Sequence, residues 1–153
     1  MAMTHGAAWG ALVLRVVLGI ILVMHAYGSL FIVGPGDLAA TVTRHGFPPG
    51  TAGLATWYAI GVQALGGALI VIGLWTRRAA LVNIPVMLGA LLLLHWPQGF
   101  FMRAIIADPS SGRAAAIGYE LSLLVLACTV AVALIGAGPY SIDSRRNAPG
   151  RRR

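Results

Sequence analysis

The sequence carries very little charge. Only 10% of its 153 residues are charged and 58% are hydrophobic, whereas a soluble globular domain usually has about 25% charged residues. So few charged side chains cannot cover a water-facing surface, so lipid must cover most of the protein. The composition therefore excludes an ordinary soluble domain and predicts an all-α integral membrane protein, with the lipid bilayer as its first partner. The length suits one compact domain.

Lysine is absent. All eleven basic residues are Arg, and the net charge is +7. These Arg residues stand at the edges of apolar runs or in the C-terminal tail, and not along one polar face as a nucleic-acid groove requires. We therefore expect no nucleic-acid partner. The single cysteine, Cys128, excludes an internal disulfide and leaves the redox compartment undetermined.

Sequence motifs for independent catalysis are also missing. The chain has no Ser-His-Asp arrangement, no phosphate-binding glycine loop and no CxxC pair. Hydrolase, nucleotide-binding and thiol-redox functions therefore lack support in the sequence. Whether the chain takes part in an enzyme stays open on this ground.

Four apolar segments are long enough to cross a bilayer, since about 20 apolar residues span about 30 Å of hydrocarbon. They cover about 9–31, 54–75, 79–96 and 115–135. A polar segment separates the first two spans, and proline- and glycine-rich stretches at both of its ends break the helices. A short turn at Thr76-Arg77-Arg78 implies that the second and third spans are antiparallel neighbours. The sequence thus predicts a four-transmembrane-helix bundle in residues 1–143, followed by a basic disordered tail, 144–153.

The first span also has the pattern of a signal peptide, with Arg15 followed by an apolar core from Val16 to Met24. We expect this segment to be retained as a span. Arg residues then set the orientation. Seven lie on the side that holds the Arg77-Arg78 turn and the tail, and three (Arg44, Arg103 and Arg113) lie on the opposite side. The positive-inside rule therefore places both termini in the cytoplasm.

Polar side chains gather in the outer half of the predicted bundle. With about 1.5 Å of rise per helical residue, His25 lies roughly 9 Å and Gln63 roughly 13 Å below the outer boundary. His95 ends the third span, and Glu120 lies roughly 7 Å deep in the fourth. Because an ionisable group in hydrocarbon costs about 3 kcal/mol, Glu120 is expected to face inward and find a partner. Tyr27 and Tyr119 can donate hydrogen bonds to the same cluster.

These six residues are candidates for a binding site. A buried carboxylic acid beside histidines could exchange protons with a bound molecule. The structural alternative is that they are hydrogen-bonding contacts between helices, which are common in membrane bundles. Two histidines and a glutamate could also hold a metal ion, and two histidines a haem. The sequence shows no metal-ligand motif, so we assign no metal ligands, although neither cofactor is excluded.

Several short motifs resemble those of the DoxX family of small four-helix membrane proteins. They are Leu14-Arg15 through Gly19 with His25 and Gly28, Gly66-Gly67 through Arg77, His95 with Gly99-Phe100-Phe101, Gly118-Tyr119-Glu120, and Gly136 through Asp143. The sequence departs from the family pattern at Gln63, where members commonly have a glutamate, and at Ser29, where many have a basic residue. If relatives use an acidic pair for proton transfer, this chain keeps only Glu120.

The resemblance implies a function in redox chemistry at the membrane. Some family members are subunits of a thiosulfate:quinone oxidoreductase, and others associate with redox enzymes. We therefore expect a subunit of a quinone-linked redox system in the bacterial plasma (inner) membrane, with a quinone-like molecule near His25, Gln63, His95 and Glu120. Electrons would come from other membrane or redox-enzyme subunits; a homo-oligomer is left open. The alternative is a non-catalytic accessory or assembly subunit of a larger membrane complex. A small-solute transporter is disfavoured because polar groups thin out toward the cytoplasm.

Overall fold

The computed structural model describes residues 4–101 and 118–146, and in these ranges it contains helices and no strand. The main helices are α1 (His5–Tyr27), α2 (Pro35–Arg44), α3 (Pro49–Ile72), α4 (Thr76–Gly89), α5 (Glu120–Ile135) and α6 (Ile142–Arg146). Two π-helical stretches, η1 (Gly28–Val33) and η2 (Ala90–His95), continue α1 and α4, and a 3-10 turn, η3 (Trp96–Gln98), follows η2. The all-α prediction is confirmed for this part of the chain.

Three helical segments are long and apolar enough to cross a membrane. They are His5–Val33, Pro49–Ile72 and Thr76–Gln98, and they correspond to the first three predicted spans. The fourth prediction, 115–135, matches α5 from Glu120 onward, but α5 has 16 residues and residues 115–117 lie outside the described ranges. The fourth crossing therefore stays a prediction. The structure places Ser144 to Arg146, assigned to the tail by sequence, in α6; residues 147–153 lie outside the described ranges.

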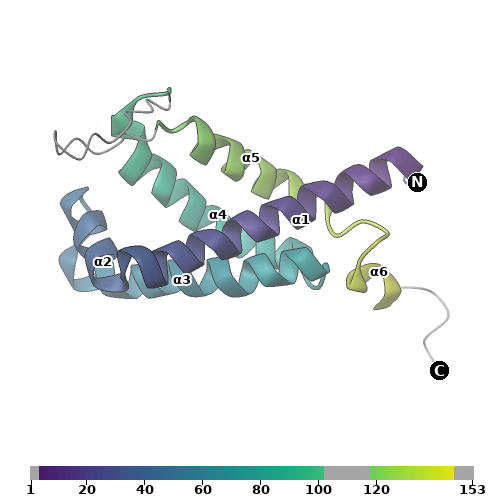
Figure 1. The fold of residues 1–153 in the computed structure, drawn as a ribbon, viewed down its shortest axis with the longest axis horizontal. Coiled ribbons are helices and arrows are strands. Elements are labelled where there is room, and N and C mark those ends of the chain that lie inside the picture. The colour runs from purple at the N-terminus through teal and green to yellow at the C-terminus, as the bar shows by residue number, and fades with distance from the viewer. Residues whose placement is uncertain (1–3, 102–117, 147–153) are drawn as a thin grey trace.

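The four longest helices, α1, α3, α4 and α5, pack against one another in chain order. α1 lies along α3, α3 contacts α4, and α4 contacts α5 (Figure 1). The predicted turn between the second and third spans is present, because Gly73 ends α3 in the left-handed conformation at φ +74° and α4 begins three residues later at Thr76. So short a connection makes α3 and α4 antiparallel neighbours.

Small residues set the distance between α1 and α3. A Cβ atom on Gly67 would lie 2.8 Å from the backbone oxygen of Gly19, and a Cβ on Gly19 would lie 2.7 Å from the backbone oxygen of Gly67. Only glycine at both positions permits this approach, which is the usual way in which helices pack closely in membranes. Around this contact lies an apolar core to which all four long helices contribute; Leu22 and Ile70 are fully buried in it.

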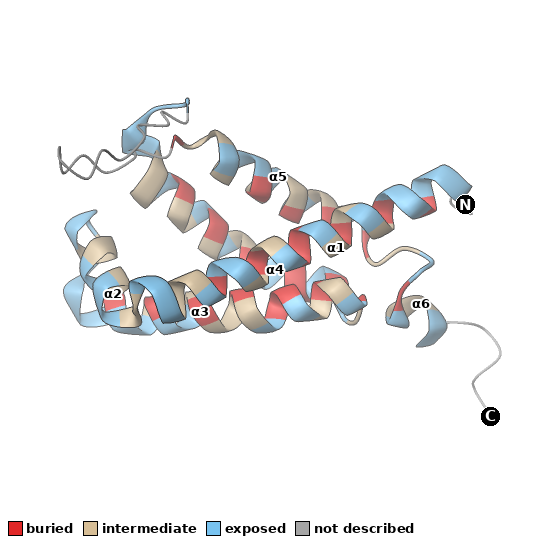
Figure 2. Ribbon diagram, viewed as in Figure 1, coloured by how far each residue is buried: buried red, intermediate tan, exposed pale blue. Residues whose placement is uncertain are grey.

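The outer faces of the helices are apolar and exposed. Leu54, Leu65 and Phe31 have 75%, 71% and 69% of their surface exposed, and pale blue residues run along the outside of every long helix in Figure 2. An exposed apolar surface of this extent is what lipid covers in a membrane protein.

The helix α2 was not predicted from the sequence. The predicted break at Gly34-Pro35-Gly36 is present, because Gly34 at φ +87° ends η1. The residues that follow form a helix, and Pro35 occupies the first turn of α2, where its missing N–H costs nothing. Asp37 in the first turn and Arg44 in the last suit the helix dipole. α2 packs against α3 and η1 and closes one end of the bundle (Figure 1).

Candidate functional site

A cavity of about 390 Å³ lies at the α2 end of the bundle, between α1, α2, α3 and α4. Three of the six residues predicted from the sequence line it: His25, Gln63 and His95. Its other lining residues are Ser29, Leu38, Val42, Phe47, Ala55, Thr56, Tyr58, Ala59, Pro85, Val86, Gly89, Ala90, Leu93 and Leu94. A mostly apolar wall with a few polar groups is typical of a small-molecule site, and the volume lies within the usual range of about 300–1,000 Å³.

Helix α3 supplies two buried polar side chains to this cavity. Thr56 and Gln63 are seven residues apart, which places them on the same face of α3 two turns apart. They are only 3% and 7% exposed. Thr56 Oγ1 is buried without a hydrogen-bond partner, and the Gln63 amide has none within the described part of the chain. A buried polar group without a partner costs about 1–3 kcal/mol, so Thr56 Oγ1 would gain from a polar ligand. The Gln63 amide, at the same cavity, can hydrogen-bond such a ligand as well.

The two histidines make the same kind of local contact. His25 Nδ1 lies 3.0 Å from the carbonyl oxygen of Ile21, and His95 Nδ1 lies 2.9 Å from the carbonyl oxygen of Ala90. A carbonyl oxygen only accepts hydrogen bonds, so in each ring Nδ1 is the nitrogen that carries the proton. The Nε2 atoms have no partner among the described residues. In its neutral form, each ring therefore offers Nε2 as an acceptor.

Both π-helical stretches border the cavity. Ser29 lies in η1, directly after α1, and η2 contributes Ala90, Leu93, Leu94 and His95. In η2 the wider turn lets His95 reach the carbonyl of Ala90, five residues earlier. π-Helical turns are rare and are frequent at functional sites. Here they determine where His95 and Ser29 stand relative to α3.

The other three predicted residues are not among those that line the cavity. Tyr27 packs its ring on Phe31 at 5.0 Å and is 51% exposed. Tyr119 stacks on Trp96 at 5.0 Å between ring centroids. Glu120 begins α5, and its backbone N–H donates to the carbonyl of Phe100. Tyr119 and Glu120 thus join the start of α5 to the segment that follows α4, outside the cavity.

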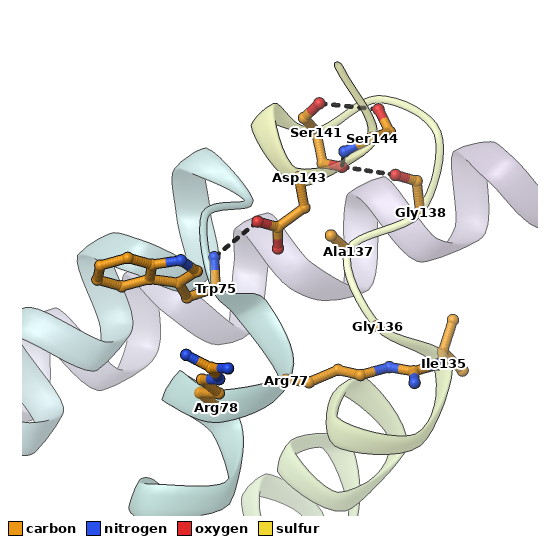
Figure 3. A pocket seen from close by; sticks show the side chains of 10 residues that line it. All are labelled: Trp75, Arg77, Arg78, Ile135, Gly136, Ala137, Gly138, Ser141, Asp143 and Ser144. Carbon is orange, nitrogen blue, oxygen red and sulfur yellow. Dashed lines mark hydrogen bonds between the residues drawn. The ribbon is translucent and has the colours of Figure 1, made fainter. Parts of the chain in front are cut away.

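A second cavity, of about 450 Å³, lies at the opposite end of α3, and Figure 3 shows it from close by. Trp75, Arg77 and Arg78 line it from the α4 side, and Gly136 to Ser144 line it from the C-terminal segment. The carboxylate of Asp143 accepts hydrogen bonds from the backbone N–H groups of Trp75 (2.9 Å) and Thr76 (3.0 Å). Asp143 therefore caps the first turn of α4 from 67 residues away.

Two Arg side chains donate hydrogen bonds to backbone carbonyls at this end of the protein. Arg15, only 2% exposed, donates to the carbonyls of Ala137 and Tyr140, each at 2.7 Å. Arg77 donates to the carbonyl of Leu134 at 3.1 Å. Asp143, Arg15 and Arg77 are thus engaged with backbone groups, which identifies this end as a structural clasp. Arg15 Nε and Thr76 Oγ1 at the clasp are also buried without a partner. The cavity beside His25 differs in its lining, which is mostly apolar with a few polar groups, and we take it as the candidate site.

Metal ligands do not gather in the described ranges: no three His, Cys, Asp or Glu side chains there lie close enough to hold a metal ion. His25 and His95 line one cavity without a third such ligand. The structure therefore gives no support to a metal centre at this site.

Sequence reasoning named none of the other fourteen lining residues as site candidates, among them Thr56, Ser29, Leu38 and Val42. Thr56 had a usable signal, since it precedes Gln63 by seven residues in an apolar helix. Leu38 and Val42 had one as well, because their spacing of four places them on one face of a helix, but the segment was not recognised as helical.

The chain matches the model of one known protein family. The DoxX family model matches residues 10–96, which include most of the three membrane-length helical segments and every lining residue of the cavity. The fold and the apolar exterior define a multi-pass helical membrane protein. The chain belongs to the DoxX family. Its further resemblance to the family from Gly118 to Asp143 lies outside this match and stays a prediction. No match was found among curated proteins or solved structures.

Proposed function

We propose that the protein binds a quinone-like molecule in the cavity between α1, α2, α3 and α4, as the membrane subunit of a quinone-linked redox system. One observation carries the proposal: Thr56 and Gln63 are buried residues that line this cavity, and neither Thr56 Oγ1 nor the Gln63 amide has a hydrogen-bond partner among the described residues. A quinone ring has polar oxygens on an apolar body, which matches polar groups set in apolar walls. When bound, it would carry two electrons and two protons.

The residues have separate tasks in this proposal. Gln63 and Thr56 hydrogen-bond the ring oxygens, since an amide and a hydroxyl can each donate and accept. His25 and His95 exchange protons with the ligand through Nε2. Leu38, Val42 and the other apolar side chains hold the ring and exclude water. Glu120 lies outside the lining, so the proton-relay role that the sequence suggested for it is not part of the proposal. Electrons come from a partner redox protein.

The proposed topology is four crossings with both termini in the cytoplasm. The clasp supports it, because Arg15 of α1, the turn before α4 and the segment after α5 meet at one end of the bundle. Arg77, Arg78, Arg145 and Arg146 lie in or next to this clasp, as the positive-inside rule requires of a cytoplasmic end. The cavity then lies toward the opposite, outer face.

The accessory-subunit alternative makes a different prediction for these residues. If the polar groups served only to hold helices together, Gln63 and Thr56 would bond across the bundle, as Asn83 Nδ2 does to the carbonyl of Val62 at 3.2 Å. They have no such bonds in the described ranges. This contrast favours ligand binding over a purely structural role.

The test is ligand binding to the purified full-length chain in lipid nanodiscs, using decylubiquinone and a short-chain naphthoquinone. We expect saturable binding that Gln63→Leu and Thr56→Val each weaken about 5- to 30-fold, as expected when a hydrogen bond of about 1–2 kcal/mol is lost. His45→Ala is the matched control, since His45 makes the same Nδ1 contact, to Thr41, at 2.9 Å but is not a lining residue of the cavity. Binding that none of the cavity variants changes contradicts the proposal.

A further inference from the structure

The hydrogen bonds of the two histidines carry information about the chemical form of the ligand. In His25 and in His95, Nδ1 is committed as a donor to a carbonyl oxygen of its own helix. A neutral imidazole with its proton on Nδ1 has only an acceptor left at Nε2. In their neutral form, the rings of His25 and His95 therefore line the cavity as acceptors, because the backbone contact keeps the proton on Nδ1.

Quinones and quinols differ at the atoms that such acceptors would meet. A quinone oxygen is a carbonyl and can only accept, so it would face Nε2 lone pair to lone pair. A quinol oxygen carries a proton and can donate to Nε2. Gln63 and Thr56 do not discriminate, because each can donate to a carbonyl or accept from a hydroxyl. The choice between the two forms therefore lies with the histidines.

From this geometry we infer that the cavity selects the hydroxyl form, a quinol or related phenol, over the carbonyl form, with His25 and His95 as the residues that determine the preference. The inference rests on the proposed function and adds the oxidation state of the preferred ligand. A quinone oxygen bound against Nε2 would exclude water and leave both atoms without a hydrogen bond, so we expect the quinol to bind about tenfold more tightly than the quinone.

Selective binding of one form has a measurable redox consequence. A ligand whose reduced form binds tenfold more tightly has its two-electron midpoint potential raised by about 30 mV on the protein. This readout does not depend on turnover with any partner. It also distinguishes a role in selecting the ligand from a role in folding, because a merely structural histidine would leave the potential of the bound ligand unchanged.

The experiment compares decylubiquinol and decylubiquinone under anaerobic conditions, with the full chain in lipid nanodiscs and equilibrium binding as the readout. The dimethyl ether of decylubiquinol, which has no O–H donor, is the third probe. We expect the quinol to bind about tenfold more tightly than the quinone, and the ether to bind more weakly than the quinol. In His25→Gln and His95→Gln, the ratio should fall toward one because glutamine can donate as well as accept. His45→Gln should keep the ratio of the unaltered chain.

Two failures can be told apart. If quinone binds as tightly as quinol or more tightly, and cavity variants weaken both, the selection is wrong while the proposed function stands. If neither binds, the proposed function is wrong as well.

Long-range ¹H–¹⁵N spectra of the histidine rings provide a check that needs no ligand and no variant. Protons on the Nδ1 atoms of His25 and His95 are expected, and protons on Nε2 overturn the inference.

Discussion

The carboxylate of Asp143 lies against the backbone N–H groups at the start of α4, 2.9 Å from that of Trp75, 68 residues away in the sequence. The backbone N–H of Asp143 in turn donates to the carbonyl of Gly73 at 2.9 Å. The two contacts attach the C-terminal segment to the turn between α3 and α4 (Figure 3). They hold one end of the bundle together while the candidate site lies at the other, so the two ends can be tested separately.

Removing this cap should lower stability without affecting the site. Replacing a helix-capping Asp by Ala typically costs about 0.5–2 kcal/mol, so Asp143→Ala should unfold at lower denaturant concentration in a fixed lipid or detergent composition. Asp143→Asn keeps a capping oxygen and should recover most of the loss. If Asp143→Ala unfolds like the unaltered chain, the cap is not a stabilising contact. Ligand binding at the far cavity should stay the same in both variants.

Arg15 should not be replaceable by lysine. Its guanidinium reaches two carbonyls at once, of Ala137 and Tyr140, and a lysine ammonium lacks this planar fork. Hydrogen bonds to charged groups are worth about 1.5–3 kcal/mol each, so Arg15→Lys should lose stability and Arg15→Leu should lose more. Limited proteolysis after Pro139 should become faster in both. Unchanged protease resistance of Arg15→Leu would contradict the clasp.

The glycine contact between α1 and α3 gives a prediction with a matched control. Gly67→Ala places a Cβ atom against the backbone of Gly19, and overpacking of this kind typically costs about 1–3 kcal/mol. Gly61→Ala, in the same helix, meets no atom within 4 Å and should be neutral or stabilising by about 0.5–1 kcal/mol, since alanine favours helix. Thermal unfolding of both variants checks this, and equal effects would mean that α1 and α3 do not approach at Gly67.

Asn83 should act as a helix-to-helix contact and not as part of the site. It is fully buried, and Nδ2 donates to the carbonyls of Ala79 at 2.8 Å and Val62 at 3.2 Å. Inter-helix hydrogen bonds in membranes average about 0.6 kcal/mol and reach about 1.7 kcal/mol, so Asn83→Leu should destabilise the fold modestly and leave ligand affinity unchanged. A loss of affinity in a stably folded Asn83→Leu would extend the site toward α4.

Composition and hydropathy predicted the helical class and the first three spans because membrane-length apolar helices have a strong, local signal. They did not predict α2, since a ten-residue amphipathic helix that begins at a proline resembles a loop in sequence. The site was predicted in part. Depth along a helix placed His25, Gln63 and His95 at one level, and the structure brings them to one cavity. Depth alone cannot tell which way a side chain faces, so it did not separate these three residues from Tyr27, Tyr119 and Glu120, which are not among the lining residues of this cavity.

Photolabelling tests the central claim, a ligand-binding cavity between α1, α2, α3 and α4, most directly. A photoreactive short-chain quinone would be irradiated with the full chain in nanodiscs, and labelled residues identified by mass spectrometry, with excess unlabelled decylubiquinol as competitor. The account predicts competitor-sensitive labels on α3 between Thr56 and Gln63 and on the segment from Pro85 to His95. Labels found only on the lipid-facing surface, or only in the clasp between Trp75 and Ser144, would contradict it.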